Sequence, residues 1–405
     1  MKNTNLKIKK NIIIGTRKSA SMKVSSQKFE KIFKNIKIDI KNSKKTLNIL
    51  SKDFKFNFKF EDLKRFKKYK SIALIGMGGS ILGAEAIYNY FQSKITKKVH
   101  FFNNLNENEL STFKYKTNLS KTLFIIVSKS GNTIETLSNT YALNILKKNA
   151  KNIIVITEKK NNSLFLLAKK LNLFYVEHKN FIGGRYSVLS EVGMIPAYLM
   201  GLNILKLRSK ISDCVKDKNK NFLKNSTINL ANLITSKKYN NLIFLNYFPE
   251  LEKFLYWCQQ LIAESLGKKS IGFLPIISNA PKDHHSLLQL YLDGPKDKFF
   301  NIFSFEKQSK EKIKINKKVS IDNFFNNKKL SKIKNAQKQA LIKSFKKRNI
   351  PFRELKIKTN NEEELGKLFS FFILETIIVG NLLKINPYNQ PAVEQVKIDT
   401  KKLLS

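Results

Sequence analysis

Apolar residues recur along this chain in two alternating patterns. Short apolar runs at 71–75 and 122–127 predict buried strands, and the helical spacing of apolar residues at 81–91 follows the first of them. Further strand-like runs lie at 152–157 and 173–176. Strands without a polar face, alternating with helices, are typical of a parallel sheet that helices cover on both sides.

A second cycle of the same alternation begins after about residue 220. Its predicted elements are strands at 242–246, 271–274 and 299–305 and helices at 251–266, 286–292, 330–348 and 361–384. We therefore predict an α/β protein of two units of similar architecture, each a parallel sheet covered by helices, with helical extensions at both ends. The expected segments are a helical N-terminal part at 1–65, domains at 66–215 and 216–385, a C-terminal segment at 386–405, and a surface excursion rich in Lys and Asn at 306–330.

Length and charge narrow the possibilities further. The 405 residues suggest two or three domains, and 42% hydrophobic with 26% charged residues indicates a globular protein. A formal net charge of +46 would suit a nucleic-acid or anionic membrane partner. However, only six of the 76 basic residues are Arg, the residue best suited to phosphate and base recognition, and the Lys residues are spread along the chain. We therefore favour a solvated lysine-rich surface and expect no nucleic-acid partner.

Membrane and disulfide-rich classes are not expected. The sequence contains no run of 18 apolar residues, so we expect neither a transmembrane helix nor a membrane partner. Cys214 and Cys258 are too few for a disulfide framework and form no CxxC pair, which favours a reducing, cytoplasmic environment.

A glycine-rich loop follows the first predicted strand. It reads Gly76-Met77-Gly78-Gly79-Ser80 and leads into a helix, whose free N–H groups could face an anion. It is neither a dinucleotide-binding loop, which would need Gly at position 81, nor a Walker A loop, which needs Gly-Lys-Ser/Thr. A tight turn between strand and helix explains this loop equally well.

A second loop strengthens the phosphate interpretation. Ser128-Lys129-Ser130-Gly131-Asn132-Thr133 follows the strand at 122–127, and its three hydroxyls could bind the oxygens of one phosphate monoester. Taken alone, the same hydroxyls could serve only as a helix cap. Two such loops at the carboxyl ends of strands in one sheet fit the rule that ligands of α/β proteins bind at that edge.

Further residues could carry chemistry. Arg185 follows two glycines in a chain with few Arg, which suggests a need for a planar guanidinium. Gln260 and Glu264 share one face of a predicted helix, where Glu264 could act as a general base or form a surface pair with Lys268.

The chain has four His, and His284 and His285 are adjacent. No Cys or carboxylate lies near them at the spacing of a metal site, so we expect no metal there. One His of the pair suits proton transfer.

In order and spacing these motifs resemble the phosphoglucose isomerase family, whose members are built from two sugar-isomerase (SIS) domains. The resemblance implies that each domain is an α-β-α sandwich with a flavodoxin-like parallel sheet. The resemblance covers about residues 70–400. The motifs that carry it are Gly76-Met77-Gly78-Gly79-Ser80, Ser128-Lys129-Ser130-Gly131-Asn132-Thr133, Gly183-Gly184-Arg185, Glu264-Ser265-Leu266-Gly267-Lys268, His285 with Gln289, and Val393-Glu394 with Lys397.

The resemblance implies an isomerase that interconverts glucose 6-phosphate and fructose 6-phosphate through an enediolate, without cofactor or metal. The catalytic residues it implies are Glu264 as the base, Arg185 for the enediolate, and His285 with Lys397 for ring opening. The substrate- and phosphate-binding residues it implies are Gly79, Ser80, Ser128, Lys129, Ser130, Thr133, Gln260 and Gln390. It also implies a homodimer in which the histidine comes from the neighbouring subunit.

Some choices stay open at the level of sequence. His284 stands where the family usually has Gln, although the Ser-x-x-Gln that follows favours His285. The alternatives are a phosphomannose isomerase, a bifunctional phosphoglucose/phosphomannose isomerase and a non-catalytic sugar-phosphate-binding protein. The last would keep the two loops and lose the base, so the joint presence of Glu264, His285 and Lys397 favours an enzyme.

Overall fold

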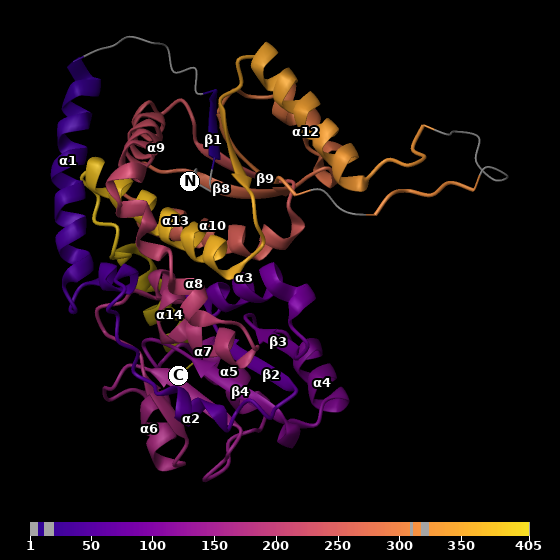
Figure 1. The fold of residues 1–405 in the computed structure, drawn as a ribbon. Coiled ribbons are helices and arrows are strands. Elements are labelled where there is room, and N and C mark those ends of the chain that lie inside the picture. Colours follow the sequence, from indigo (N-terminus) through magenta and orange to yellow (C-terminus); the bar gives the residue numbers. More distant parts are fainter. Residues whose placement is uncertain (1–6, 12–19, 308–310, 317–323, 405) are drawn as a thin grey trace.

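The computed structural model describes residues 7–11, 20–307, 311–316 and 324–404. Two α/β units lie one above the other in Figure 1, with the first sheet in the lower unit and the second sheet in the upper unit. The predicted excursion at 306–330 lies partly outside the described residues, and its described parts between 307 and 329 contain no helix or strand.

The first unit contains a parallel sheet in the order β3-β2-β4-β5-β6. Its strands are β2 (Ser71–Gly76), β3 (Lys98–Phe102), β4 (Thr122–Val127), β5 (Ile153–Thr157) and β6 (Phe174–Glu177). Its helices are α2 (Phe60–Lys64), α3 (Leu82–Phe91), α4 (Glu107–Lys116), α5 (Ile134–Ala142), α6 (Ser163–Lys170), α7 (Glu191–Leu199) and α8 (Ile204–Arg208). Strands β4 and β5 are buried along their whole length, and the strand order is flavodoxin-like, as predicted.

The second unit contains a sheet in the order β1-β10-β9-β7-β8. Its strands are β1 (Lys7–Asn11), β7 (Asn241–Asn246), β8 (Leu274–Asn279), β9 (Lys298–Phe305) and β10 (Phe352–Ile357). Its helices are α1 (Ala20–Lys41), α9 (Asp217–Thr235), α10 (Glu252–Leu266), α11 (Leu288–Asp293), α12 (Leu330–Lys347) and α13 (Glu362–Leu382). All pairs are parallel except β1 with β10, so two parallel-sheet α/β units are confirmed.

Three details differ from the sequence prediction. The N-terminal segment is not wholly helical, because β1 is an edge strand of the second sheet. The strand predicted at 271–274 begins only at Leu274. Strand β10 is absent from the prediction, because its charged residues Arg353 and Glu354 disrupt the apolar pattern. Both are nevertheless buried, since each has an oppositely charged partner inside the protein.

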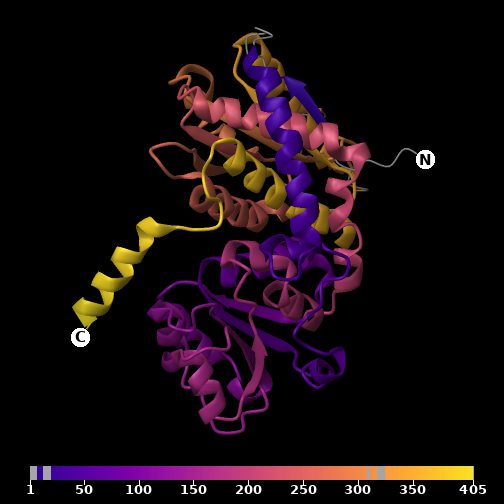
Figure 2. The same ribbon diagram turned by 90° about the vertical axis from the view of Figure 1, so that its left-hand side faces the viewer.

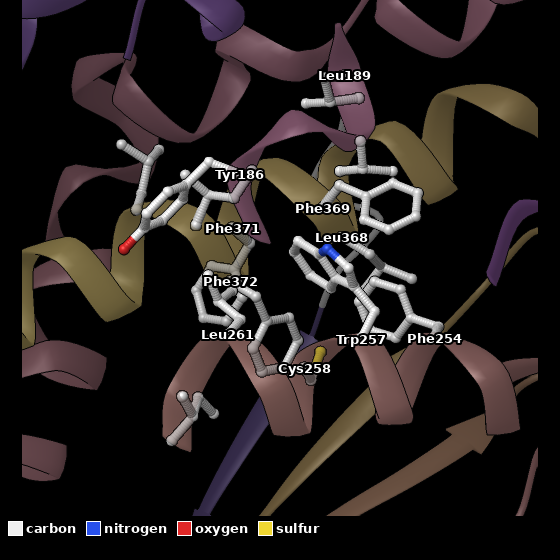
Figure 3. Packing of buried hydrophobic residues seen from close by; sticks show 14 of the residues in the cluster. Tyr186, Leu189, Phe254, Trp257, Cys258, Leu261, Leu368, Phe369, Phe371 and Phe372 are labelled. Atoms are coloured by element: carbon white, nitrogen blue, oxygen red, sulfur yellow. The ribbon is translucent and has the colours of Figure 1, made fainter. Parts of the chain in front are cut away.

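Helix α10 joins the two units. On one face Phe254, Trp257 and Cys258 are buried against α13 (Figure 3), and the ring of Trp257 meets that of Phe369 edge-on at 4.8 Å. Another face packs against α3 of the first unit. Burying each large apolar side chain contributes roughly 1.5–3 kcal/mol to stability. This packing fixes the position of α10 and therefore also the position of the polar residues on its remaining surface.

Two helices near the C-terminus differ sharply in burial. Within the described ranges, α13 is the one helix long and apolar enough to cross a membrane, but 83% of its most apolar 18-residue window is buried inside the protein. It is a core helix. Helix α14 (Glu394–Leu404) instead projects from the body in Figure 2, and its apolar residues Val396, Ile398 and Leu403 are exposed in the single chain.

Acid should destabilise this fold through His178. Its imidazole is 2% exposed, Nδ1 donates to the carbonyl oxygen of Lys179 (3.0 Å), and burial lowers its pKa from 6.5 to about 4. Because the unfolded chain takes up this proton near pH 6.5 and the folded protein only near pH 4, lowering the pH through this window favours unfolding, by roughly 3 kcal/mol in total.

We expect His178→Gln to flatten the dependence of the free energy of unfolding on pH between 6.5 and 4, measured by urea titration. An equal slope in the variant and the parent protein would contradict this assignment.

Candidate active site

The ends of β2 and β4 bring two loops together at the carboxyl edge of the first sheet. Gly76 lies opposite Val127 in the register of these neighbouring parallel strands. The glycine loop (residues 76–80) and the hydroxyl loop (residues 128–133) therefore leave the sheet side by side. This is the edge at which ligands of such sheets bind.

The glycine loop lies in backbone contact with the segment that carries Arg185. A Cβ atom on Gly79 would lie 2.2 Å from the carbonyl carbon of Gly184 and 2.4 Å from the backbone nitrogen of Arg185. Only glycine permits this approach. The contact fixes the position of Arg185 relative to the first sheet.

The side chains of the hydroxyl loop contact one another and do not cap the helix that follows. Ser128 Oγ and Thr133 Oγ1 are 2.9 Å apart, and Ser128 Oγ accepts from the N–H of Gly131 (3.1 Å). Thr133 is the N-cap residue of α5, but its side chain accepts no hydrogen bond from the first turn. Ile81, the N-cap residue of α3, likewise provides no side-chain acceptor. The N–H groups at the starts of both helices therefore have no side-chain acceptor and could donate to an anion. This favours a phosphate-binding role for the two loops over a role as helix caps.

The guanidinium of Arg185 is 3% exposed and uses all five of its N–H groups on acceptors within the protein. Nε donates to Ser265 Oγ (2.8 Å), Nη1 to Glu264 Oε2 (3.1 Å) and Gln390 Oε1, and Nη2 to the carbonyl oxygens of Pro387 (2.7 Å) and Asn389 (3.1 Å). These acceptors belong to α10 and to the C-terminal strap (residues 386–390). Arg185 therefore links the first unit, α10 and the strap.

Glu264 and Gln260 lie together on α10 beside Arg185. Gln260 Nε2 donates to Glu264 Oε1 (3.0 Å), as their spacing predicts. The Glu264 side chain is 33% exposed, so one side of the carboxylate is open. The Oε1 atom of Gln260 is buried and has no hydrogen-bond partner within the described residues. A buried acceptor without a donor, next to an oriented carboxylate, suits a ligand hydroxyl.

Lys129 of the hydroxyl loop already has partners in the first unit. Its Nζ donates to the carbonyl oxygen of Asn180 (2.8 Å) and lies 3.6 Å from Glu158. Burial lowers the pKa of Lys129, and the charge of Glu158 opposes this shift. A phosphate would share this ammonium with both groups.

The two adjacent histidines have different surroundings. His284 is half-buried, and its Nε2 lies 2.6 Å from the hydroxyl of Tyr247. Burial lowers the pKa of His284 and raises that of Tyr247. His285 is exposed, and its imidazole makes no hydrogen bond to the described residues. His285 is therefore the histidine that is free to meet a ligand.

Two predicted residues lie outside the group around Arg185 in the single chain. Lys397 is on the projecting helix α14, with its side chain 59% exposed and paired to Glu394 at 2.8 Å. The hydrogen bonds and ion pairs described for Arg185 and Glu264 include neither Lys397 nor His285. One chain thus brings Arg185 together with Glu264, Gln260 and Gln390 but leaves out His285 and Lys397.

Three residues that were not predicted as catalytic or substrate-binding residues support the group around Arg185. Ser265 accepts from Arg185, Tyr186 donates its hydroxyl to the carbonyl oxygen of Pro387 (2.8 Å), and Lys268 Nζ donates to that of Asn386 (2.6 Å). Burial and the nearby charge of Arg185 lower the pKa of Lys268 to about 8, against the opposing effect of Glu264. Ser265 and Lys268 stand in the motif Glu264-Ser265-Leu266-Gly267-Lys268, and Tyr186 follows Arg185, but these positions alone do not indicate a supporting role.

The two sheets, whose strands are parallel apart from β1, are bridged by α10, and two loops leave the carboxyl edge of the first sheet. The glycine loop among them lies against Gln260 and the segment of Arg185, next to the Glu264 carboxylate. These features define a two-domain sugar-phosphate isomerase. The family model for phosphoglucose isomerase matches residues 30–405. The chain belongs to this family, and it is an isomerase.

Individual relatives and solved structures agree with this assignment. A probable glucose-6-phosphate isomerase from Methanococcus maripaludis is 33% identical over 84% of this chain and 80% of its own length. The fold is similar to that of a hypothetical protein from Thermus thermophilus, with a TM-score of 0.86 and 21% identity over 99% of this chain and 100% of that one. It is also similar to that of a glucose-6-phosphate isomerase from Chlamydia trachomatis, with a TM-score of 0.81 and 17% identity over 99% of this chain and 89% of that one.

We expect Arg185→Lys to lower kcat/KM by about 100-fold or more, because one ammonium cannot replace a planar fork that serves five acceptors. Hydrogen exchange of the backbone amides in the C-terminal strap should also become faster. The matched control is Arg348→Lys on the exposed surface, which should leave both quantities unchanged. Unaltered turnover in Arg185→Lys would show that the guanidinium geometry is not required.

Proposed function

We propose that this chain interconverts glucose 6-phosphate and fructose 6-phosphate through an enediolate, the aldose–ketose step of glycolysis and gluconeogenesis. The family assignment and the names of the curated relatives support this reaction. The observation that carries the proposal is the pair formed by Glu264 and the buried Arg185, whose Oε2 and Nη1 atoms are 3.1 Å apart, next to the glycine loop.

Glu264 is the base in this scheme. Its carboxylate takes the proton from C2 of the open-chain sugar and returns it to C1, so that no external proton or cofactor is consumed. Arg185 stabilises the negative oxygen that develops between these steps. Because every N–H of Arg185 already has an acceptor, we infer that this oxygen replaces Gln390 Oε1 on Nη1. The released amide of Gln390 can then bind a sugar hydroxyl.

The phosphate is anchored away from the reacting carbons. Ser80 of the glycine loop and the hydroxyls of Ser128, Ser130 and Thr133 would take the phosphate oxygens, together with the free N–H groups at the starts of α3 and α5. Binding energy from this remote group orients C1 and C2 against Glu264. Lys129 adds charge at the rim, and Gly79 lets the backbone approach the ligand closely.

We expect Glu264→Gln to reduce kcat at least about 1,000-fold while the dissociation constant for the sugar phosphate changes only a few-fold, because the amide preserves shape but cannot accept a proton. Coupled assays in both directions and calorimetric titration measure the two quantities. Glu250→Gln, at an exposed position just before α10, is the matched control and should behave as the parent protein. Turnover of Glu264→Gln within a few-fold of the parent would refute the assignment of the base.

The complete site is proposed to form in a homodimer. Ring opening needs an acid near the sugar, yet His285 is exposed and lies outside the Arg185 group in one chain. A second copy could bring its His285 to this group, as the family resemblance implies. The exposed apolar residues of α14 supply a surface that such an arrangement could cover, and Lys397 would then be brought into the site.

The dimer can be tested by mixing two inactive variants. In a heterodimer of Glu264→Gln and His285→Ala subunits, one site carries both changes and the other carries neither. Co-expression should therefore restore about a quarter of the parent activity if subunits pair at random. His284→Gln should need no such rescue. No recovery in the mixture would show that both residues act within one subunit.

The proposal includes a cytoplasmic location and a reaction without metal or cofactor. Proton transfer by a carboxylate and charge stabilisation by a guanidinium suffice for an enediolate mechanism. Formation of fructose 6-phosphate by enzyme that has been dialysed against a chelator tests this part, and loss of activity that a divalent cation restores would reject it.

A further inference from the structure

The turn that follows β5 lies directly behind the hydroxyl loop and is tied to it along its length. Three backbone hydrogen bonds connect the segments, from Ser128 N–H to the carbonyl oxygen of Ile156 (3.1 Å), from Glu158 N–H to that of Lys129 (3.2 Å) and from Leu164 N–H to that of Gly131 (3.0 Å). The side chain of Asn132 also accepts from Ser163 N–H (2.9 Å). The path of the hydroxyl loop thus depends on the segment at 156–164.

Asn162 closes this supporting turn. It is 3% exposed, its Oδ1 accepts from the N–H of Phe165 (2.9 Å), and its Nδ2 donates to the carbonyl oxygen of Glu158 (3.0 Å). One side chain therefore caps α6 and fixes the start of the turn.

The same amide is packed against Gly131 of the hydroxyl loop. Gly131 has φ +70, and a Cβ atom there would lie 1.7 Å from Oδ1 and 2.1 Å from Cγ of Asn162. The loop can turn at this point because Gly131 allows the left-handed conformation and leaves room for the amide. Asn162 is thus in contact with the backbone between Ser128 and Thr133.

We propose that Asn162 is a positioning residue for the phosphate group of the substrate, which it sets by supporting the hydroxyl loop with a neutral side chain. This inference rests on the proposed phosphate role of that loop. Neutrality matters because an aspartate would cap α6 equally well but would place a negative charge behind a site for a dianion. The nearby acid, Glu158, does not act in this way, since it is paired with Lys129 and Lys160.

The decisive variant is Asn162→Asp, which keeps the shape and the capping oxygen. We expect KM for both sugar phosphates to rise about tenfold, with kcat within about twofold of the parent, because the charge opposes phosphate binding and not proton transfer. The inhibition constant of inorganic phosphate should rise by a similar factor. The midpoint of thermal unfolding should fall as well, because the buried carboxylate cannot donate to the carbonyl oxygen of Glu158, so the rise in KM at unchanged kcat is the diagnostic result.

Asn203→Asp is the matched control. Asn203, at an exposed position, caps α8 by accepting from Lys206 N–H (2.9 Å), and the residues hydrogen-bonded to it, Lys206 and Leu207, lie outside both loops. It should leave KM, kcat and the phosphate inhibition constant unchanged. Asn162→Ser, a capping residue without charge, should raise KM less than Asn162→Asp, and it supplies the measurement if the aspartate variant fails to fold.

The outcomes separate this inference from the function on which it rests. Ser128→Ala is measured in parallel, because it removes a hydroxyl assigned to the phosphate. If Ser128→Ala raises KM and neither Asn162 variant does, the positioning role of Asn162 is rejected. If none of the three raises KM or the inhibition constant, the phosphate site itself is rejected. A fall in kcat and in thermal stability with KM unchanged would assign Asn162 a purely structural role and overturn the proposal.

Discussion

The structure depends on the burial of one positive charge. Arg185 is almost wholly removed from water, and a buried charge is tolerated only when it is paired and hydrogen-bonded. Five acceptors meet this requirement, but only one of them, Glu264, carries the opposite charge. The counter-ion that stabilises the buried arginine is therefore the carboxylate assigned to the chemistry. Packing of α10 against α13 and α3, the close approach at Gly79 and the course of the C-terminal strap all serve to keep this pair together.

The need of a buried positive charge for several acceptors also explains where the arginines of this chain lie. Of the five arginines that the structure describes, Arg185, Arg208 and Arg353 are buried, and each donates to two or more acceptors. The planar fork of arginine can serve several acceptors in fixed directions, which an ammonium cannot do. Lys338 shows that a lysine can also be buried when it is paired, here with Glu354, but the buried cation with the most acceptors described is Arg185.

Much of the fold could be predicted from sequence because strands that are buried on both faces, such as β4, appear as short continuous runs of apolar residues. The prediction failed at β10, where Arg353 and Glu354 are satisfied by partners distant in sequence, which no local pattern reveals. The site also combines local features, which the sequence reveals, with contacts between residues distant in sequence, which it does not. Loops after adjacent strands and an i, i+4 pair are local features, so their meeting could be expected. The support from Ser265, Tyr186 and Asn162 arises from contacts across the fold, and the single chain leaves His285 and Lys397 outside the group around Arg185.

The uncapped starts of α3 and α5 have a consequence for the stability of the protein. N–H groups at these helix starts lack side-chain acceptors, and a phosphate bound in the proposed site would supply acceptors for them. Any molecule that binds only the folded state shifts the unfolding equilibrium by mass action, by about 2.7 kcal/mol at a free concentration one hundred times its dissociation constant. The metabolite pool that the enzyme equilibrates would therefore also act as its stabiliser, and the folded population would follow the supply of sugar phosphate.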